Sequence, residues 1–157
     1  MGKSVQMRHS RNLAGGSTMR IMGLDVGDAT IGVAISDELG LTAQALNTIR
    51  RKSMIEDLKV LGSIIDERKI SKIVIGFPKN MNNTIGERAN KTIEFSKIVK
   101  ETYPSLEIVL WDERLTTVAA EKTLLEANIS RKNRKKVIDK IAAVFILQNY
   151  LDAQKNA

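Results

Sequence analysis

The stretch Ile21–Ile35 constrains this chain more than any other, because an apolar strand within it ends in a carboxylate. Apolar residues lead up to Asp25, Gly27 follows two residues later, and a second apolar segment begins at Ile31. Glycine permits a positive φ, or lets another group approach the backbone closely. A carboxylate in this position is either exposed at a strand end or binds something. The stretch therefore predicts two strands joined by a tight turn beside Asp25.

The rest of the chain predicts an α/β fold with the order β-β-β-α-β-α-β-α-α. Period-2 and short apolar segments indicate five strands: Arg20–Val26, Ile31–Asp37, Thr42–Ile49, Lys72–Gly76 and Leu106–Trp111. Capping boxes and helical spacing indicate four helices: Ser53 to about Arg68, Thr84–Glu87 to about Thr102, Thr116 or Thr117 to about Asn128, and about Lys136–Ala153. We expect a mixed sheet, an antiparallel three-strand meander extended by parallel strands, with helices on both faces. The last helix is apolar almost all round and should be well buried.

Composition excludes several classes of chemistry. Met1–Thr18 is polar and has no apolar periodicity, so we expect an expression leader, disordered or non-native, followed by a single domain over Met19–Ala157. The one histidine, His9, lies in that leader and the chain has no cysteine. Catalysis by histidine or thiolate, disulfides, histidine-metal sites and cysteine-zinc sites are therefore excluded. No apolar run is long enough to span a bilayer, and the composition indicates a cytoplasmic protein.

Acidic residues occupy three places that an apolar core would not favour. Asp25 ends the first strand, Asp112 and Glu113 follow the last strand, and Asp139 lies on an apolar stripe of the final helix. In open α/β sheets, ligands bind outside the carboxyl ends of strands. Each acid has a structural alternative, however. Asp139 could complement the helix dipole, Asp112 could cap a helix, and Glu113 could pair with a nearby cation.

Taken together, the acids predict a metal site. Carboxylate and water oxygens suit Mg²⁺ or Mn²⁺, which complete their shells with phosphate oxygens. Two such ions could hold the attacking and leaving oxygens of a phosphodiester, so that water acts without a histidine. We therefore predict a divalent-metal site with two ions when substrate is bound.

Basic residues supply candidate phosphate contacts. The chain carries a net charge of +7, and about +4 without the leader, which is compatible with a phosphate-bearing partner. The candidate nucleic-acid-binding residues are Lys79, Asn80, Arg88, Arg114, Arg131, Lys132, Arg134, Lys135 and Lys136. The run from Arg131 to Lys136 could equally be a solvated charged loop. Few aromatic residues are present, so base stacking and sequence-specific readout are not indicated.

Four motifs in order resemble the YqgF family of the RNase H-like superfamily. They are Asp25-Val26-Gly27 with Gly32-Val33-Ala34, then Gly76-Phe77-Pro78, then Asp112-Glu113-Arg114-Leu115-Thr116-Thr117, then Asp139 with Ala142-Ala143. The resemblance covers Met19 to about Leu151. It implies an RNase H-like fold, divalent-metal nuclease chemistry and a nucleic-acid substrate.

The resemblance also assigns roles to individual residues. Asp25 matches the first-strand acid and Asp139 matches the acid of the final helix. The middle acid is Asp112 or Glu113. Strand alternation would put these two on opposite faces, and we favour Asp112 slightly as the metal ligand. Asp28 replaces a small hydroxyl residue, and its charge could bind metal or weaken the approach of phosphate.

Two substrates are compatible with the family, which is also called a pre-16S ribosomal RNA nuclease or a Holliday junction resolvase. We favour 5′-end processing of the 16S ribosomal RNA precursor over cleavage of branched DNA. Junction resolution requires a symmetric dimer, whereas the sequence indicates a monomer or weak homodimer. Two other classes stay open. A phosphate-binding ATPase-like domain is disfavoured by length, and a non-catalytic nucleic-acid-binding factor would tolerate Asp25→Asn.

Overall fold

The computed structural model describes residues 19–77, 86–112 and 131–156, with residues 131–140 described by their helical backbone alone. The elements in chain order are β1 (Arg20–Val26), β2 (Thr30–Ser36), β3 (Ala43–Ala45), β4 (Ile49–Arg50), α2 (Met54–Arg68), β5 (Ile70–Phe77), α3 (Glu87–Thr102), β6 (Glu107–Asp112) and α5 (Arg131–Lys155). Within these ranges, no helix is long and apolar enough to cross a membrane.

The strands form one mixed sheet in the order β3-β2-β1-β5-β6, and β4 also pairs with β2. β2 is antiparallel to β1, β3 and β4, whereas β1, β5 and β6 run parallel. The predicted mixed sheet is confirmed, but the single third strand Thr42–Ile49 is wrong. β3 and β4 are separate short strands, because the exposed Asn47 and Thr48 interrupt the pairing.

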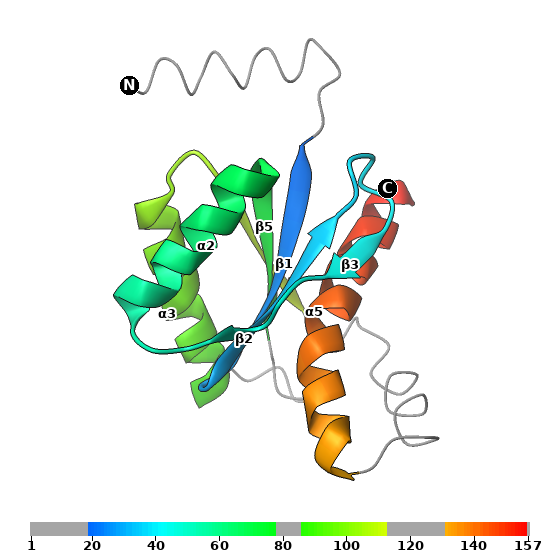
Figure 1. Ribbon diagram of the computed structural model, residues 1–157. Coiled ribbons are helices and arrows are strands. Elements are labelled where there is room, and N and C mark those ends of the chain that lie inside the picture. The colour runs from blue at the N-terminus through cyan, green and yellow to red at the C-terminus, as the bar shows by residue number, and fades with distance from the viewer. Residues whose placement is uncertain (1–18, 78–85, 113–130, 157) are drawn as a thin grey trace.

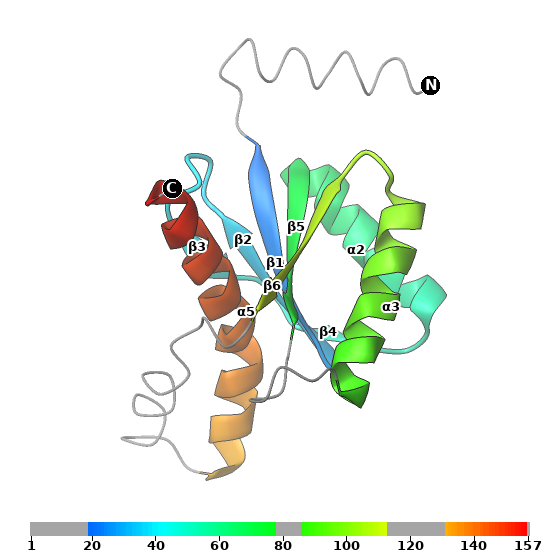
Figure 2. The same ribbon diagram turned by 180° about the vertical axis from the view of Figure 1, so that it is seen from behind.

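Helices cover both faces of the sheet, as the sequence predicts. α2 and α3 lie on one face and α5 lies on the other (Figures 1 and 2). The strand pleat sends Met22 and Leu24 into the cluster beneath α2 and α3, whereas Ile21 packs with the cluster beneath α5. This alternation tells which side of the sheet each strand residue faces.

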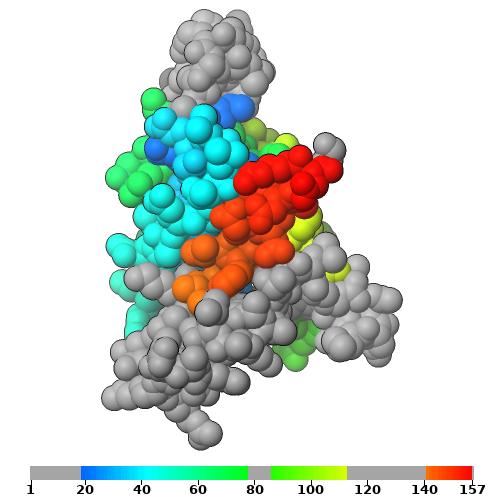
Figure 3. Space-filling model, turned by 90° about the vertical axis from the view of Figure 1, so that its right-hand side faces the viewer, coloured from blue at the N-terminus to red at the C-terminus, as the bar shows by residue number. Residues whose placement is uncertain are grey.

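α5 approaches the sheet closely at Gly23. A Cβ at this glycine would lie 2.7 Å from the Leu147 Cβ and 3.1 Å from the Ala143 carbonyl oxygen. Ala143 and Leu147 are fully buried, and no residue from 141 to 151 is exposed, which confirms the predicted burial for this part of the last helix. Figure 3 shows the C-terminal half of α5, in orange and red, against the cyan β2–β3 segment. Gly23 thus fixes α5 against the strand that carries Asp25.

The helix boundaries match the sequence signals in part. The capping box at Ser53 is confirmed, because the Ser53 hydroxyl accepts a hydrogen bond from the Glu56 N–H at 3.2 Å. The predicted Thr84–Glu87 box is wrong, since α3 begins at Glu87 after an extended Gly86 that makes no side-chain cap. α5 begins at Arg131 rather than near Lys136. The predicted helix from Thr116 or Thr117 to Asn128 lies outside the described residues.

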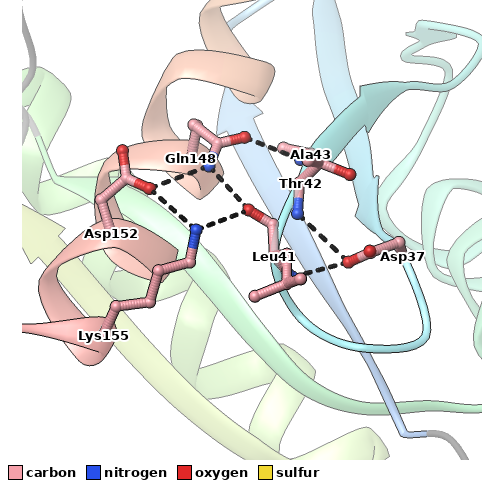
Figure 4. Close-up of polar contacts among 7 residues, drawn as sticks. All are labelled: Asp37, Leu41, Thr42, Ala43, Gln148, Asp152 and Lys155. Carbon is pink, nitrogen blue, oxygen red and sulfur yellow. Dashed lines mark hydrogen bonds and ion pairs between the residues drawn. The ribbon is translucent and has the colours of Figure 1, made fainter.

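A polar network fastens the C-terminal end of α5 to the turn after β2 (Figure 4). The Gln148 side chain accepts from the Ala43 N–H at 2.8 Å and donates to the Leu41 carbonyl at 3.0 Å. Lys155 donates to the same carbonyl at 3.1 Å. Within the turn, the Asp37 carboxylate accepts from the backbone N–H groups of Leu41 and Thr42. These bonds, that of Thr42 foremost, lower the pKa of Asp37 below its ordinary value of 3.8.

The lowered pKa of Asp37 predicts a contribution to acid stability. A carboxylate whose folded pKa lies below its unfolded pKa stabilises the fold above the unfolded value, and that stability is lost as the pH falls through the folded value. We therefore expect Asp37→Asn to lower the urea midpoint at pH 7 and to shrink the difference between the midpoints at pH 7 and pH 2.5. Glu67→Gln, at an exposed position of α2, is the control. Equal pH dependence in the two variants would contradict the role of Asp37.

Candidate functional site

Asp25 lies at the carboxyl end of β1, on the face of the sheet that α5 covers. It pairs with Gly32 across the β1–β2 ladder and follows Gly23, which contacts α5, by two residues. Residues two apart in a strand share a face. The Asp25 side chain is only 17% exposed. The sequence prediction of a strand-end carboxylate is thereby confirmed. This carboxylate lies near the carboxyl end of β1, on the side of the sheet where α5 packs.

The turn after Asp25 is tight. The Gly27 N–H donates to the Thr30 carbonyl at 2.9 Å, and a Cβ at Gly27 would lie 3.1 Å from that same oxygen. Gly27 does not have a positive φ; among the described residues only Lys69 and Gly40 do. Of the two reasons for a glycine here, the close approach of a backbone oxygen is the one the structure supports.

α3 brings two cations to the acids of β1 and its turn. Arg88 Nη2 lies 3.4 Å from Asp25 Oδ1, and Lys91 Nζ lies 3.2 Å from Asp28 Oδ1. Both basic side chains are more than half exposed, and exposed ion pairs contribute only about 0–1 kcal/mol. A divalent cation at Asp25, or a phosphate at Arg88, can therefore replace these pairs at small cost. The hard oxygen donor at Asp25 fits Mg²⁺ or Mn²⁺.

Asp112 ends β6 at the same end of the sheet as Asp25, where the parallel strands have their carboxyl ends, but it lies on the opposite face of the sheet. Its strand neighbours Val109 and Trp111 pack with the cluster beneath α5, whereas Ile108 packs with the cluster beneath α2 and α3. In register, Asp112 pairs with Phe77 of the parallel strand β5. Alternation therefore assigns Asp112 to the α2/α3 face, opposite to that of Asp25.

The backbone of α5 brings Asp139 towards the same end of the sheet as Asp25. Asp139 precedes the buried Ala143 by four residues, which is about one helical turn. The N-terminal end of α5 lies at the end of the molecule where β1 finishes (Figure 1). The helical backbone of α5 also includes Arg131, Lys132, Arg134, Lys135 and Lys136, so the loop considered for these residues is wrong.

The remaining candidates lie outside the described residues: Lys79, Asn80, Glu113 and Arg114. Among the described side chains, no three acidic, histidine or cysteine residues are placed so that they could hold a metal ion. The predicted metal ligands are Asp25, Asp139 and either Asp112 or Glu113. Glu113 and the side chain of Asp139 lie outside the described part of the chain, so the structure describes this ligand set only in part.

Comparison with known proteins identifies the family. The RuvX family, described as a Holliday junction resolvase, matches residues 19–153. A Staphylococcus haemolyticus protein named "Putative pre-16S rRNA nuclease" is 55% identical over 138 residues, which cover 87% of this chain and 97% of the relative. A Clostridium tetani protein of the same name is 56% identical over 88% of this chain and 99% of its own length. The chain belongs to the RuvX family.

One solved structure supports the fold of this RuvX-family chain. Thermus thermophilus RuvC, in complex with a Holliday junction substrate, aligns with a TM-score of 0.56 and 10% identity over 88% of this chain and 97% of RuvC. At such low identity the likeness concerns the fold alone. It confirms the RNase H-like architecture that the sequence motifs predict.

Sequence patterns do not single out three residues that the structure places at this end of the RuvX-family fold: Lys91, Arg51 and Asp57. Lys91 follows Arg88 by three residues on a predicted helix, so helical spacing could have indicated it. Arg51 and Asp57 carry no local signal. In sequence, Asp57 is only one of two acids in the first turn of α2, yet its side chain is 3% exposed.

Proposed function

We propose that this RuvX-family chain is a divalent-metal-dependent nuclease that hydrolyses phosphodiester bonds. The observation that carries the proposal is the approach of α5 to β1 at Gly23, which brings the backbone of the Asp139 helix to the edge where Asp25 lies half-covered. A pair of divalent ions needs carboxylates from separate elements of the fold, and Asp25 and Asp139 come from a strand and a helix that meet at this end of the sheet. The high identity to relatives named as nucleases supports this assignment.

The metal ligands that we propose are Asp25, Asp139 and one acid at the end of β6. Bound ions would activate water and stabilise the charge that develops on the phosphodiester oxygens. In this proposal the sheet positions Asp25 and the acid at the end of β6, and α5 positions Asp139. Arg88 and Lys91 lie beside the acids and are proposed to hold non-bridging phosphate oxygens, Arg88 once a divalent cation takes its place at Asp25.

The substrate that we favour is the precursor of 16S ribosomal RNA, on the strength of the names of the relatives. Branched DNA is the alternative, because the family is described as a Holliday junction resolvase. The first substrate suits a monomer or weak homodimer in the cytoplasm. The second requires two sites related by symmetry.

A cleavage panel tests the proposal. The full chain is incubated with Mg²⁺ or Mn²⁺ and a 5′ fragment of the 16S precursor, an unstructured RNA or a four-way DNA junction. Asp139→Asn is run in parallel to reveal any contaminating nuclease. We expect metal-dependent cleavage of the precursor that the variant loses. Paired symmetric nicks in the junction would instead favour the resolvase, and binding without any cleavage would contradict the nuclease proposal.

Glu113 is the acid at the end of β6 that we now propose as the ligand in place of Asp112. Asp112 faces away from Asp25, and strand alternation would return the next position to the α5 face. We expect Glu113→Gln to reduce kcat by at least about a hundredfold, and Asp112→Asn by less than about tenfold. Each variant serves as the control for the other in the same cleavage assay. The reverse order of effects would restore Asp112 as the ligand.

A further inference from the structure

Arg51 joins three parts of the fold beside the β1–β2 turn. It lies directly after β4, and its backbone N–H donates to the Ala29 carbonyl at 2.9 Å. Its guanidinium donates through Nη1 to the Gly27 carbonyl at 2.9 Å and through Nε to Asp57 Oδ2 at 3.0 Å. The guanidinium carbon also lies 5.5 Å from the centre of the Phe95 ring on α3. Arg51 thus bonds both carbonyls that flank Asp28 at the tip of the turn.

Asp57 holds that guanidinium from the other side. Its carboxylate is 3% exposed and accepts from Arg51 through Oδ2 and from the Lys52 N–H through Oδ1 at 3.1 Å. A buried charge requires a charged partner and hydrogen bonds to its oxygens, and this carboxylate has both. The Asp57 carboxylate therefore fixes the orientation of the Arg51 guanidinium, and Asp57 itself is held in the first turn of α2.

We propose that the Arg51–Asp57 pair positions the β1–β2 turn so that the Asp25 carboxylate keeps the geometry a divalent cation requires. This inference rests on the proposed nuclease function. Gly27 follows Asp25 by two residues, and beyond the strand ladder the Gly27 N–H closes the turn by donating to the Thr30 carbonyl. Metal ligands have to be held within about 0.5 Å of their productive position. Arg51 and Asp57 are positioning residues in this scheme and contact no metal.

The chemistry of arginine explains why this side chain suits the position. A guanidinium presents several N–H donors in a rigid plane, so it bonds a carboxylate and a carbonyl in different directions at once. A lysine ammonium on its flexible stem is a point charge without that fixed fork. Arg51→Lys therefore keeps the charge opposite Asp57 while loosening the bond to the Gly27 carbonyl.

The test compares Arg51→Lys with two controls in the full-length chain. Arg50→Lys is the same change at the exposed neighbour, and Val99→Ala removes buried volume beneath α3 and so lowers stability away from the turn. The readouts are Mn²⁺ affinity by calorimetry, the Mg²⁺ concentration for half-maximal cleavage, and hydrogen exchange of the Gly27 amide. We expect Arg51→Lys to weaken both metal measurements by about tenfold, with kcat at saturating metal within about threefold. Exchange at Gly27 should accelerate in this variant, and neither control should show these changes.

Two outcomes separate this inference from the function on which it rests. If Arg51→Lys changes metal dependence no more than Val99→Ala does, the pair serves stability alone and the inference is overturned. If no substrate is cleaved by the native chain, yet Arg51→Lys weakens Mn²⁺ binding and loosens Gly27, the nuclease proposal fails while the positioning role stands. Should Arg51→Lys not fold, Asp57→Asn with Glu56→Gln as its control supports or overturns the inference by the same readouts.

Discussion

Replacing Asp25 by asparagine is expected to abolish metal-dependent cleavage while leaving the fold in place. Asparagine has the shape of aspartate but lacks the negative charge that attracts a divalent cation. Arg88, which pairs with Asp25 at 3.4 Å, is 62% exposed, so the loss of this ion pair costs little stability. We expect kcat to fall by at least about a hundredfold, since a direct metal ligand matters at least as much as the groups behind it.

The matched control for this experiment is Asp28→Asn, three residues further along the same turn. Asp28 is 84% exposed and pairs with Lys91, so this change also removes one carboxylate and one exposed ion pair. It should alter cleavage by less than about tenfold, with the larger part of the change in KM because Asp28 no longer competes with phosphate for Lys91. Thermal unfolding should show both variants folded. Unimpaired function in Asp25→Asn would favour the non-catalytic nucleic-acid-binding factor.

The part of the site that could be predicted from sequence is the part encoded locally. Asp25 interrupts an apolar strand pattern and is followed by Gly27, so the strand, the turn and the exceptional carboxylate can all be recognised within a few residues. The same is true of the Ser53 cap, whose two partners are three residues apart. The mixed sheet could also be predicted, because the strands of the meander show a period of two residues and the crossover helices show helical spacing.

What could not be predicted depends on contacts between distant segments. Nothing near Arg51 in sequence shows that its guanidinium reaches Gly27, and nothing near Asp57 shows that its carboxylate is buried rather than solvated at a helix start. The face of the sheet that Asp112 takes depends on which side of β6 meets α5, and only the packing of Trp111 and Val109 with that helix shows it. The split of the third strand depends on how β2 shares its edge between two short partners.

Gly23→Ala is the second change expected to have a large effect, because this glycine sets the distance between α5 and β1. The added methyl group would lie 2.7 Å from the Leu147 Cβ and 3.1 Å from the Ala143 carbonyl oxygen. Neither atom is the end of a flexible side chain, so the helix itself has to move away from the sheet. Such overpacking typically costs about 1–3 kcal/mol, and we expect the upper part of that range in urea unfolding.

The same shift of α5 should impair function beyond the loss of folded protein. Asp139 is on this helix, one turn from Ala143, and a displacement of about 1 Å in a catalytic arrangement can cost about a hundredfold in rate. Gly40→Ala is the matched control. Its φ of +70° makes an alanine strained, at a cost of order 1 kcal/mol, but no atom lies within 4 Å of the added Cβ. We therefore expect both variants to lose stability, and Gly23→Ala alone to lose activity per folded molecule. If Gly23→Ala retains full activity per folded molecule, the spacing of α5 and β1 does not assemble the site.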